Sequence, residues 1–321
     1  LYAMHWPFHS PESARKVRVS PLHGQLQSRG ACFGELSGWE RANWFAPKGV
    51  EAIYHYSYGR QNWFHYASEE HRAVREQVGI FDLSSFGKFL FQGKDAESVL
   101  NWVSANNVAV PVNNVVYTQW LNDRGGIEAD LTVTRLSEDK YLIVTSGASQ
   151  TQDYFWLKEH IPSDAHAVVT DVTSGLAVLS VMGPLSRAFL QSLSPDNLSN
   201  EEFPFGTARE IDLGYARVIA IRISYVGELG WELYMPTEFA SGVFDAMMEC
   251  SEEYGLRLAG YHALNSLRIE KAYRHWGHDI TNEDTPLEAG LGFAVKLEKP
   301  DGFIGCEALR KKRQAPLKRR L

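Results

Sequence analysis

The chain has 321 residues, a length that predicts two domains or one large interleaved body, with a core that needs no disulfide support. Hydrophobic residues make up 44% and charged residues 22% of the sequence, a globular composition that argues against disorder. The formal net charge of −7 speaks against a general nucleic-acid binder or a protein of anionic membranes, with the basic tail 310–320 as a local exception.

The three cysteines, Cys32, Cys250 and Cys306, are far apart in the sequence and odd in number. This pattern matches neither a disulfide framework nor a zinc motif, and it suits a reducing compartment. No apolar run reaches about 18 residues, so we expect no membrane span. The chain opens without a signal peptide or an initiator Met, from which we expect a fragment or processed product of a longer polypeptide.

The first part of the chain shows little periodicity. Residues 1–19 are expected to form a connector, and the aromatic-rich stretch 20–67 is expected to form irregular, packed coil with short strands. A helix is predicted from Ser68, which can cap its N-terminus, to Gly79. The pattern that follows predicts two further elements, a strand over 86–91 and a helix over 95–106.

The clearest hairpin signal lies between residues 115 and 135. Two strand-like runs flank a turn-forming cluster, Asn122-Asp123-Arg124-Gly125-Gly126. Apolar and polar residues alternate in the second run, so its two faces should differ. One face is expected to carry Ile127, Ala129, Leu131 and Val133, and the other Glu128, Asp130, Thr132 and Thr134.

The rest of the chain mixes strands and helices without regular β-α-β alternation, which favours an α+β fold over a doubly wound sheet. A second hairpin is predicted around Val226-Gly227-Glu228-Leu229-Gly230, and a helix after Gly183 with Pro184 at its first position. The other predicted elements are strands over 141–145, 167–172, 176–181, 217–224 and 231–235 and helices over 150–160, 237–254 and 262–275.

Sequence motifs for several common sites are absent. The chain has no G-x-G-x-x-G, Walker loop, C-x-x-C, H-E-x-x-H or G-x-S-x-G, so it carries no dinucleotide fingerprint. His275 and His278 flank Gly277, and we interpret them as capping or solvent-facing residues and expect no metal site. Glu270 and Arg274, four residues apart on a predicted helix, are interpreted as a structural pair.

Asp130 is the first candidate for chemistry. An aspartate is disfavoured in the middle of a strand, and this one sits between Glu128 and Thr132 on the polar face. A functional carboxylate and an ordinary solvated strand face both fit this pattern.

The second hairpin carries another candidate group. Tyr225, Trp231, Glu232 and Tyr234 combine ring surfaces with a carboxylate. Such a set can grip a flat heterocycle that bears N–H donors, by stacking and by hydrogen bonding. An ordinary packed hairpin with one paired glutamate fits these residues as well.

Taken together, these segments resemble a known family. The run Asn122 to Leu131 resembles the signature of the glycine-cleavage T-protein and its folate-dependent relatives. Shorter segments match in the same order, and coverage runs from about Ser20 to the end of the chain. They are Gly38-Trp39-Glu40, Gly79-Ile80-Phe81-Asp82-Leu83-Ser84, Met182-Gly183-Pro184, Tyr225 to Leu233, Pro286 to Leu291 and Phe303-Ile304-Gly305.

Two further runs, Tyr58 to Phe64 and Leu267 to Trp276, resemble the folate half of the dimethylglycine dehydrogenase and sarcosine dehydrogenase branch. This resemblance implies that FAD is bound only in an N-terminal flavin domain that this chain lacks. Residues 1–19 would then be the connector from the missing flavin domain. Residues 20–321 would be the T-protein-like folate-binding region, with the C-terminal β-barrel missing.

The resemblance implies an α+β fold of two interleaved T-protein-like lobes with mixed sheets around a central folate channel. It also implies tetrahydrofolate as the cofactor, with Asp130 as the catalytic carboxylate near the reacting nitrogens. The further folate contacts that it implies are Tyr117, Thr132, Tyr225, Glu232, Tyr234 and Phe293, with Glu232 on the pterin.

Three positions depart from the T-protein pattern. Ala129 replaces the first of its paired acidic residues, Ser85 replaces a His, and Leu264 replaces an Arg near the folate. These changes argue against a true aminomethyl-lipoyl reaction. The implied function is capture, as 5,10-methylene-tetrahydrofolate, of the methyl carbon oxidised by an FAD-dependent dimethylglycine or sarcosine dehydrogenase.

Two alternatives stay open. One is a non-catalytic homologue that resembles the regulatory subunit of pyruvate dehydrogenase phosphatase, and the other is a stand-alone aminomethyltransferase. The implied partners are the chain's own flavin domain, a small N-methyl amine and folate, with no nucleic acid and no membrane. The implied location is the cytoplasm in a bacterium and the mitochondrial matrix in a eukaryote.

Overall fold

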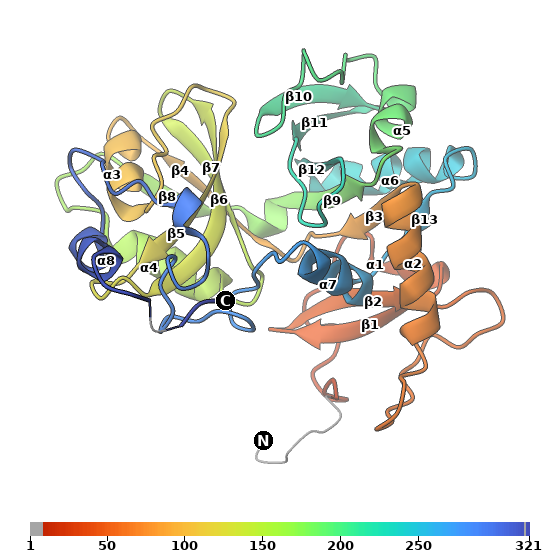
Figure 1. The fold of residues 1–321 in the computed structure, drawn as a ribbon. Helices are drawn as coiled ribbons and strands as arrows, with labels where there is room; N and C mark the ends of the chain where they lie inside the picture. Colours follow the sequence, from red (N-terminus) through yellow and green to blue (C-terminus); the bar gives the residue numbers. More distant parts are fainter. Residues whose placement is uncertain (1–8, 318) are drawn as a thin grey trace. The chain divides into compact units, whose positions relative to one another are not determined.

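The computed structural model describes residues 9–317 and 319–321, and these form two compact units. Unit 1 comprises the described residues up to Ser85 together with 174–205 and 209–273, and unit 2 comprises 86–173, 206–208 and the described residues from Arg274 onward. The chain therefore passes repeatedly from one unit to the other, as its colours show (Figure 1). The predicted connector 1–19 lies partly outside the described residues.

Unit 1 contains a six-stranded sheet in the order β10-β11-β12-β9-β3-β13. The pairings β11–β12, β12–β9 and β9–β3 are antiparallel, whereas β13 runs parallel to β3. The strands are β3 Gly79–Asp82, β9 Leu176–Met182, β10 Ala208–Leu213, β11 Ala216–Ile221, β12 Gly230–Pro236 and β13 Arg257–Leu258.

One face of this sheet forms the core of unit 1. Trp231, Leu233 and Leu179 are fully buried there against Phe189 of α5 (Ser186–Leu193) and Phe244 of α6 (Ala240–Glu249). Successive side chains of a strand point to opposite faces. The residues between these apolar ones, including Glu232 and Tyr234, therefore lie on the other face of the sheet.

A separate hairpin in unit 1 pairs β1 (Ala31–Leu36) with β2 (Trp39–Phe45). It is joined to helices α2 (Phe64–Glu76) and α7 (Tyr261–Glu270) through a buried carboxylate. Glu70 of α2 accepts hydrogen bonds from the backbone N–H groups of Phe45 at 2.7 Å and Gly260 at 2.9 Å. The short helix α1 (His23–Ser28) precedes the hairpin.

Unit 2 contains a five-stranded sheet in the order β5-β6-β7-β4-β8, all antiparallel. Its strands are β4 Gly87–Gln92, β5 Val115–Leu121, β6 Ile127–Ser137, β7 Lys140–Thr145 and β8 Val168–Asp171. Its helices are α3 Ala96–Val103, α4 Gln150–Glu159 and α8 Cys306–Arg313, and it also contains the 3₁₀ turn η3 Gly292–Ala294. Of the other two 3₁₀ turns, η2 Thr237–Phe239 belongs to unit 1, and η1 Thr173–Gly175 lies where the chain passes from unit 2 to unit 1.

The two faces of the sheet in unit 2 also differ. Phe89, Leu131 and Ile143 belong to a buried cluster that includes residues of α3. The cross-strand neighbours Tyr117 and Thr132 lie on the opposite face. A mixed sheet in unit 1 and an antiparallel sheet in unit 2, on a chain that alternates between the two units, confirm the predicted α+β class.

The predicted turn of the first hairpin is confirmed. The backbone N–H of Asn122 donates to the Gly126 carbonyl at 2.9 Å, and the Asn122 side-chain oxygen accepts from the N–H groups of Arg124 and Gly126. Gly125 has a φ of 81°, which a residue without a Cβ adopts readily. The face of β6 that was predicted to be apolar is buried at Ile127, Ala129, Leu131 and Val133.

Several helix bounds differ from the prediction. α2 begins at Phe64 rather than Ser68, α5 begins at Ser186 rather than Pro184, and α7 ends at Glu270 rather than near residue 275. Ala272 has a φ of 55°, which is incompatible with a continued helix. Arg274 therefore lies outside α7, and its Nε donates to the Ala289 carbonyl.

Several elements were not predicted. They include α1, the regular β1–β2 hairpin in a stretch expected to be irregular coil with short strands, strands β3, β10 and β13, and helix α8 at the start of the basic tail. α8 forms because Cys306 and Leu309 are buried on one side, while its basic residues remain largely exposed.

The close approach of Gly260 to β2 gives a test of the packing in unit 1. A Cβ at Gly260 would lie 2.1 Å from the carbonyl oxygen of Asn43. Gly260→Ala should therefore lower the free energy of unfolding by about 1–3 kcal/mol or more. Gly242→Ala is the control, because a Cβ there meets nothing within 4 Å inside α6; it should stabilise by roughly 0.5–1 kcal/mol. Urea unfolding curves of both variants measure the difference, and equal stabilities would contradict this packing.

Candidate functional site

The first polar cluster lies in unit 2 around Asp130. The register of the β5–β6 hairpin places Gln119 directly opposite Asp130, and Tyr117 directly opposite Thr132. The Gln119 amide donates from Nε2 to Asp130 Oδ1 at 2.9 Å. The Tyr117 ring stacks on Phe293 with 6.1 Å between ring centroids. Phe293 itself is 70% exposed, so its ring offers an open aromatic surface beside the cluster.

The environment of Asp130 changes its acidity. Burial raises the pKa of Asp130 to about 6, although hydrogen bonds from Gln119 and Tyr117 favour the charged form. A carboxyl with a pKa near 6 exchanges its proton readily close to neutral pH, which is the requirement for a general base. Asp130, Glu128 and Thr132 are each half-buried on this strand face.

A second buried carboxyl, Asp153 on α4, lies in the same unit. Its Oδ2 accepts hydrogen bonds from Ser149 at 2.8 Å and from Thr145. Burial raises the pKa of Asp153 to about 6, and the negative charges of Glu128 and Asp130 act in the same direction. The sequence analysis missed this residue, because an aspartate in the first turn of a helix is usually an exposed partner of the helix dipole.

The second polar cluster lies in unit 1 around Glu232. The Tyr234 hydroxyl donates to Glu232 Oε2 at 2.5 Å. Burial raises the pKa of Glu232 to about 7, and the Tyr234 hydrogen bond opposes that shift. Ser180 is the direct cross-strand neighbour of Glu232, and within the described residues its buried hydroxyl has no hydrogen-bond partner. A buried acceptor and an unsatisfied hydroxyl thus lie side by side.

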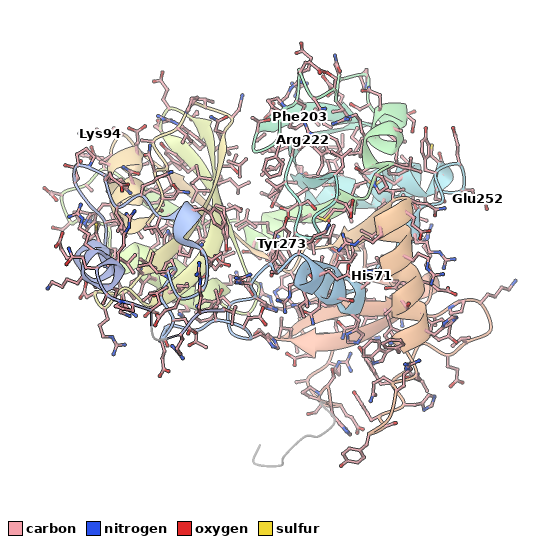
Figure 2. The ribbon with its side chains drawn as sticks, viewed as in Figure 1. His71, Lys94, Phe203, Arg222, Glu252 and Tyr273 are labelled. Carbon is pink, nitrogen blue, oxygen red and sulfur yellow. The ribbon has the colours of Figure 1, made fainter. Side chains whose placement is uncertain are left out.

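Tyr225 lies in the loop 222–229 that precedes β12. Its ring is half-buried and stacks on Tyr273 with 6.0 Å between centroids and 20° between planes. Tyr273 follows α7 (Figure 2). Tyr225 therefore presents a ring that is already held in place by a second ring.

The predicted site residues lie partly in unit 1 and partly in unit 2. Tyr117, Asp130 and Thr132 share one sheet face in unit 2, where Phe293 packs on Tyr117. The predicted residues of unit 1 are Tyr225, Glu232 and Tyr234, and the last two are hydrogen-bonded to each other.

One predicted grouping is wrong. Trp231 does not join Glu232 and Tyr234, because alternate residues of β12 face opposite ways and Trp231 is fully buried in the core of unit 1.

Sequence reasoning also missed two polar neighbours. Gln119 and Ser180 lie opposite the two key carboxyls. The turn at 122–126 predicts the hairpin but not this pair, because a β-bulge between Trp120 and Leu121 shifts the register by one residue and so places Gln119 opposite Asp130.

Two kinds of feature are absent from the part of the chain that the structure describes. It contains no group of three or more His, Cys, Asp or Glu side chains placed to hold a metal ion. None of its helices combines the length and the apolar character that crossing a bilayer requires.

The hydrogen bond from Gln119 gives a test of the Asp130 environment. Gln119→Leu removes a donor to the charged carboxylate and should raise the pKa of Asp130 above its present value of about 6. The measurement is a carboxyl-carbon NMR titration, assigned with Asp130→Asn. Gln152→Leu is the control, since that exposed side chain touches only the Glu128 carbonyl. An unchanged or lowered pKa in Gln119→Leu would contradict the role of this hydrogen bond.

Comparisons with known proteins agree on one family. The family model of the GCVT N-terminal domain matches residues 22–299. 4-Methylaminobutanoate oxidase (formaldehyde-forming) of Paenarthrobacter nicotinovorans is 47% identical over 311 residues, covering 97% of this chain and 38% of that protein. Mitochondrial sarcosine dehydrogenase of Homo sapiens is 37% identical over 358 residues, covering 100% of this chain and 39% of that protein.

The fold has a solved counterpart. The glycine cleavage system aminomethyltransferase T from Bartonella henselae matches with a TM-score of 0.78 at 24% identity, covering 94% of this chain and 76% of that one. The chain spans about two fifths of the length of the curated relatives described above. It has the glycine-cleavage T-protein fold and belongs to the GCVT N-terminal domain family, as the T-protein-like portion shared with the sarcosine dehydrogenases.

Proposed function

We propose that this chain binds tetrahydrofolate and captures a one-carbon unit released from an N-methyl amine, which leaves as 5,10-methylene-tetrahydrofolate. The observation that carries the proposal is Asp130, a carboxyl on the polar face of a T-protein-type sheet whose pKa of about 6 suits proton transfer. The family membership supports the choice of folate.

Each unit, taken by itself, carries residues that fit the chemistry of a reduced folate. A pterin is flat and bears neighbouring N–H donors, which a carboxylate accepts well. Glu232 is such an acceptor, and the Ser180 hydroxyl beside it has no partner within the described residues. Tyr225, together with Tyr117 and Phe293, supplies ring surfaces for stacking.

Asp130 and its neighbours then perform two tasks. Tetrahydrofolate supplies nucleophilic nitrogens for the one-carbon unit. As the two folate nitrogens bond to the carbon of the oxidised amine (an iminium), the bond from that carbon to the amine nitrogen breaks, the demethylated amine leaves and one proton is released. Asp130 accepts that proton, and Gln119 keeps the carboxylate ionised and oriented. Glu232 and Tyr234 hold the ligand so that the encounter with a reactive carbon becomes local rather than dilute. Local capture also limits the escape of formaldehyde.

The source of the carbon unit is proposed to be an FAD-dependent oxidation in a flavin portion of the same protein. Relatives named sarcosine dehydrogenase and 4-methylaminobutanoate oxidase, each more than twice as long as this chain, support that assignment. We propose an N-methyl amino acid as the substrate, of the dimethylglycine or sarcosine type. Within this scheme residues 1–19 connect the flavin portion to the folate-binding portion.

Turnover by the full-length protein separates this proposal from its alternatives. Dimethylglycine, sarcosine and 4-methylaminobutanoate form the substrate panel. Oxidation of any of them with an artificial electron acceptor supports the dehydrogenase. A protein that binds folate but oxidises none of them fits a regulatory homologue or a stand-alone aminomethyltransferase instead, and lipoyl-dependent aminomethyl transfer then distinguishes these two.

Glu232→Gln tests the binding role of the second cluster. The substitution replaces one acceptor oxygen with a donor NH₂ group, so a donor would face the donors of the pterin. We expect the binding free energy of tetrahydrofolate to weaken by roughly 1.5–3 kcal/mol, measured by calorimetry.

Because the pKa of Glu232 is about 7, affinity in the unmodified protein should rise as the pH increases through 7, where the carboxylate forms. That dependence should disappear in Glu232→Gln, and unchanged affinity would show that Glu232 does not contact the ligand.

Asp130→Asn separates chemistry from binding in the full-length protein. The side chains are nearly isosteric, so the fold should survive, but the amide cannot accept the proton. Loss of a general base typically costs about 10²–10⁴-fold in the step that it serves. We expect near-normal amine oxidation, a fall in methylene-tetrahydrofolate and a matching rise in free formaldehyde.

The assay must contain a formaldehyde trap, because formaldehyde and tetrahydrofolate also condense without an enzyme. A wild-type yield of methylene-tetrahydrofolate under that trap would reduce Asp130 to a polar strand residue.

A further inference from the structure

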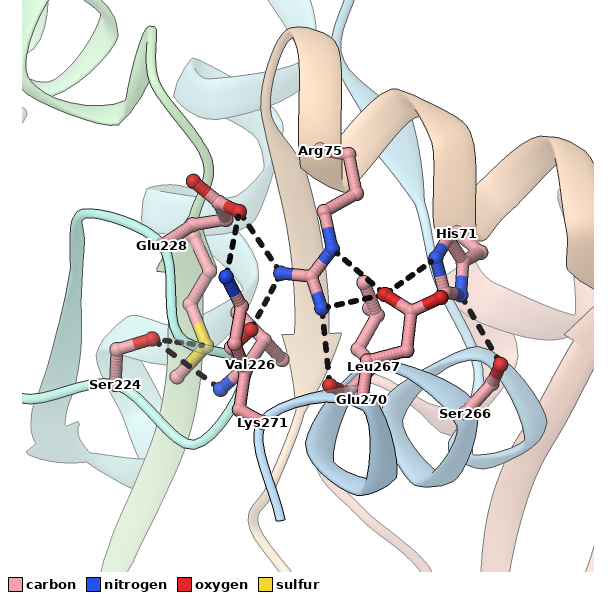
Figure 3. Close-up of polar contacts among 10 residues, drawn as sticks. His71, Arg75, Ser224, Val226, Glu228, Ser266, Leu267, Glu270 and Lys271 are labelled. Carbon is pink, nitrogen blue, oxygen red and sulfur yellow. Dashed lines mark hydrogen bonds and ion pairs between the residues drawn. The ribbon is translucent and has the colours of Figure 1, made fainter. Parts of the chain in front are cut away.

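A single arginine joins two segments of unit 1 that are far apart in the sequence. Arg75 lies in the last turn of α2, and its guanidinium points between the loop 222–229 and helix α7 (Figure 3). The Arg75 side chain is 17% exposed, as against 53% for its partner Glu270, so the contacts with the loop are the more shielded ones. Both segments belong to motifs quoted in the sequence analysis, yet the proposed folate contacts do not explain their charged residues.

The two sides of the guanidinium serve the two segments separately. Nη1 donates to the Val226 carbonyl at 2.5 Å and to Glu228 Oε1 at 2.9 Å, both in the loop. On the helix side, Nη2 donates to the Leu267 carbonyl and to Glu270 Oε2, each at 3.0 Å. Nε also donates to Glu270 Oε2, at 3.2 Å. The planar fork of an arginine suits such a two-sided arrangement.

The helix side of this network is itself restrained. His71, one turn earlier on α2, contacts Glu270 Oε2 at 3.3 Å and the Ser266 hydroxyl at 3.1 Å (Figure 3). Glu270 is thus held by two side chains of α2. Glu228, on the loop side, is held less firmly by other residues. Its further cationic neighbour, Lys271, is 4.0 Å away, whereas Arg75 is at 2.9 Å. The position of Glu228 therefore depends mainly on Arg75.

The carbonyl that accepts from Arg75 belongs to Val226, the residue that directly follows Tyr225 in the chain. The far end of the loop has its own anchors, since the Leu229 carbonyl accepts from the Gly183 N–H at 2.8 Å and from the Ser186 hydroxyl at 3.1 Å. Arg75 instead fixes the middle of the loop, beside the residue whose ring stacks on Tyr273. A shift of the Val226 peptide would move Tyr225 with it.

We infer that Arg75 is a positioning residue that holds the loop 222–229, and through it the Tyr225 ring, in the geometry required for binding the flat ring of the ligand. This inference rests on the proposed function, because it assigns Tyr225 to that ligand. Within the described residues, the hydrogen bonds of the Arg75 guanidinium go to the loop and to α7. In this inference Arg75 acts on binding through Tyr225.

The chemistry of the site explains why an arginine is needed. One side chain has to donate to two carbonyls and two carboxylates in two directions. A lysine ammonium carries three donors on a compact point charge, so it cannot span both segments with the same geometry. Lysine at position 75 would preserve the charge without preserving the position of the loop.

The experiment compares Arg75→Met and Arg75→Lys with the unmodified protein. Tetrahydrofolate affinity is measured by calorimetry below the unfolding temperature of every variant. An aromatic contact contributes up to about tenfold in affinity, so Arg75→Met should weaken binding by about that factor, and Arg75→Lys should fail to restore it. Arg257→Met is the matched control, since it removes an exposed ion pair with Glu69 of the same helix without touching the loop.

A double-mutant cycle identifies the route of the effect. If Arg75 acts through Tyr225, then Arg75→Met should cause no further loss of affinity in a Tyr225→Ala background. Equal losses in both backgrounds would overturn the inference, as would a loss no greater than that of Arg257→Met. Glu228→Gln offers a second variant on the loop side if Arg75→Met fails to fold.

A measurement without ligand keeps this test separate from the proposed function. Amide hydrogen exchange of residues 225–229 should become faster in Arg75→Met and stay unchanged in Arg257→Met. Unchanged exchange in the loop would overturn the inference even if folate binds. Failure of the unmodified protein to bind tetrahydrofolate, combined with faster exchange, would overturn the proposed ligand and the role of Arg75 in binding it, while the structural contact would stand.

Discussion

The alternation of side chains along two strands, β6 and β12, is the constraint on which the candidate site depends. In β6 the residues on either side of Asp130 are Ala129 and Leu131, both buried in the core of unit 2. In β12, Glu232 lies between Trp231 and Leu233, which are buried in the core of unit 1. Because the side-chain period of a strand is two, the apolar neighbours that hold each strand in place also force each carboxyl onto the opposite face. Burial of these apolar neighbours during folding therefore also places each carboxyl on its face of the sheet.

This placement has an energetic consequence. A carboxyl taken out of water favours its neutral form, which is why burial raises the pKa of Asp130, Glu232 and Asp153 toward neutrality. Each is met by hydrogen-bond donors, but none has an ion-pair partner among the described residues. A structural ion pair would have fixed the charge and lowered the pKa. The arrangement instead leaves the charge of each carboxyl sensitive to whatever donor or proton arrives, which is a property expected of a site for a ligand or for proton transfer.

Part of this architecture could be predicted from local sequence and part could not. The β5–β6 hairpin was predictable, because the turn at 122–126 and the strict alternation of β6 are both local signals. The α+β class followed from the same kind of pattern. The bounds of α7 were not predictable, since Lys271 and Ala272 fit a helix by propensity and the chain leaves it only because Ala272 adopts a left-handed conformation. The environment of Asp130 was also beyond local reasoning, because its burial depends on residues distant in the chain.

The same distinction applies to the loop that carries Tyr225. Its sequence predicts a turn, and Gly227, with a φ of 75°, supplies the backbone freedom. The position of the turn relative to the sheet depends on long-range contacts as well, and the contact at the middle of the loop comes from α2, about 150 residues earlier. A hydrogen bond to a loop carbonyl restrains the peptide itself rather than one side chain, so it sets the position of the neighbouring residues on both sides. Precision at a ligand-binding ring can therefore be controlled by a charged residue that never touches the ligand.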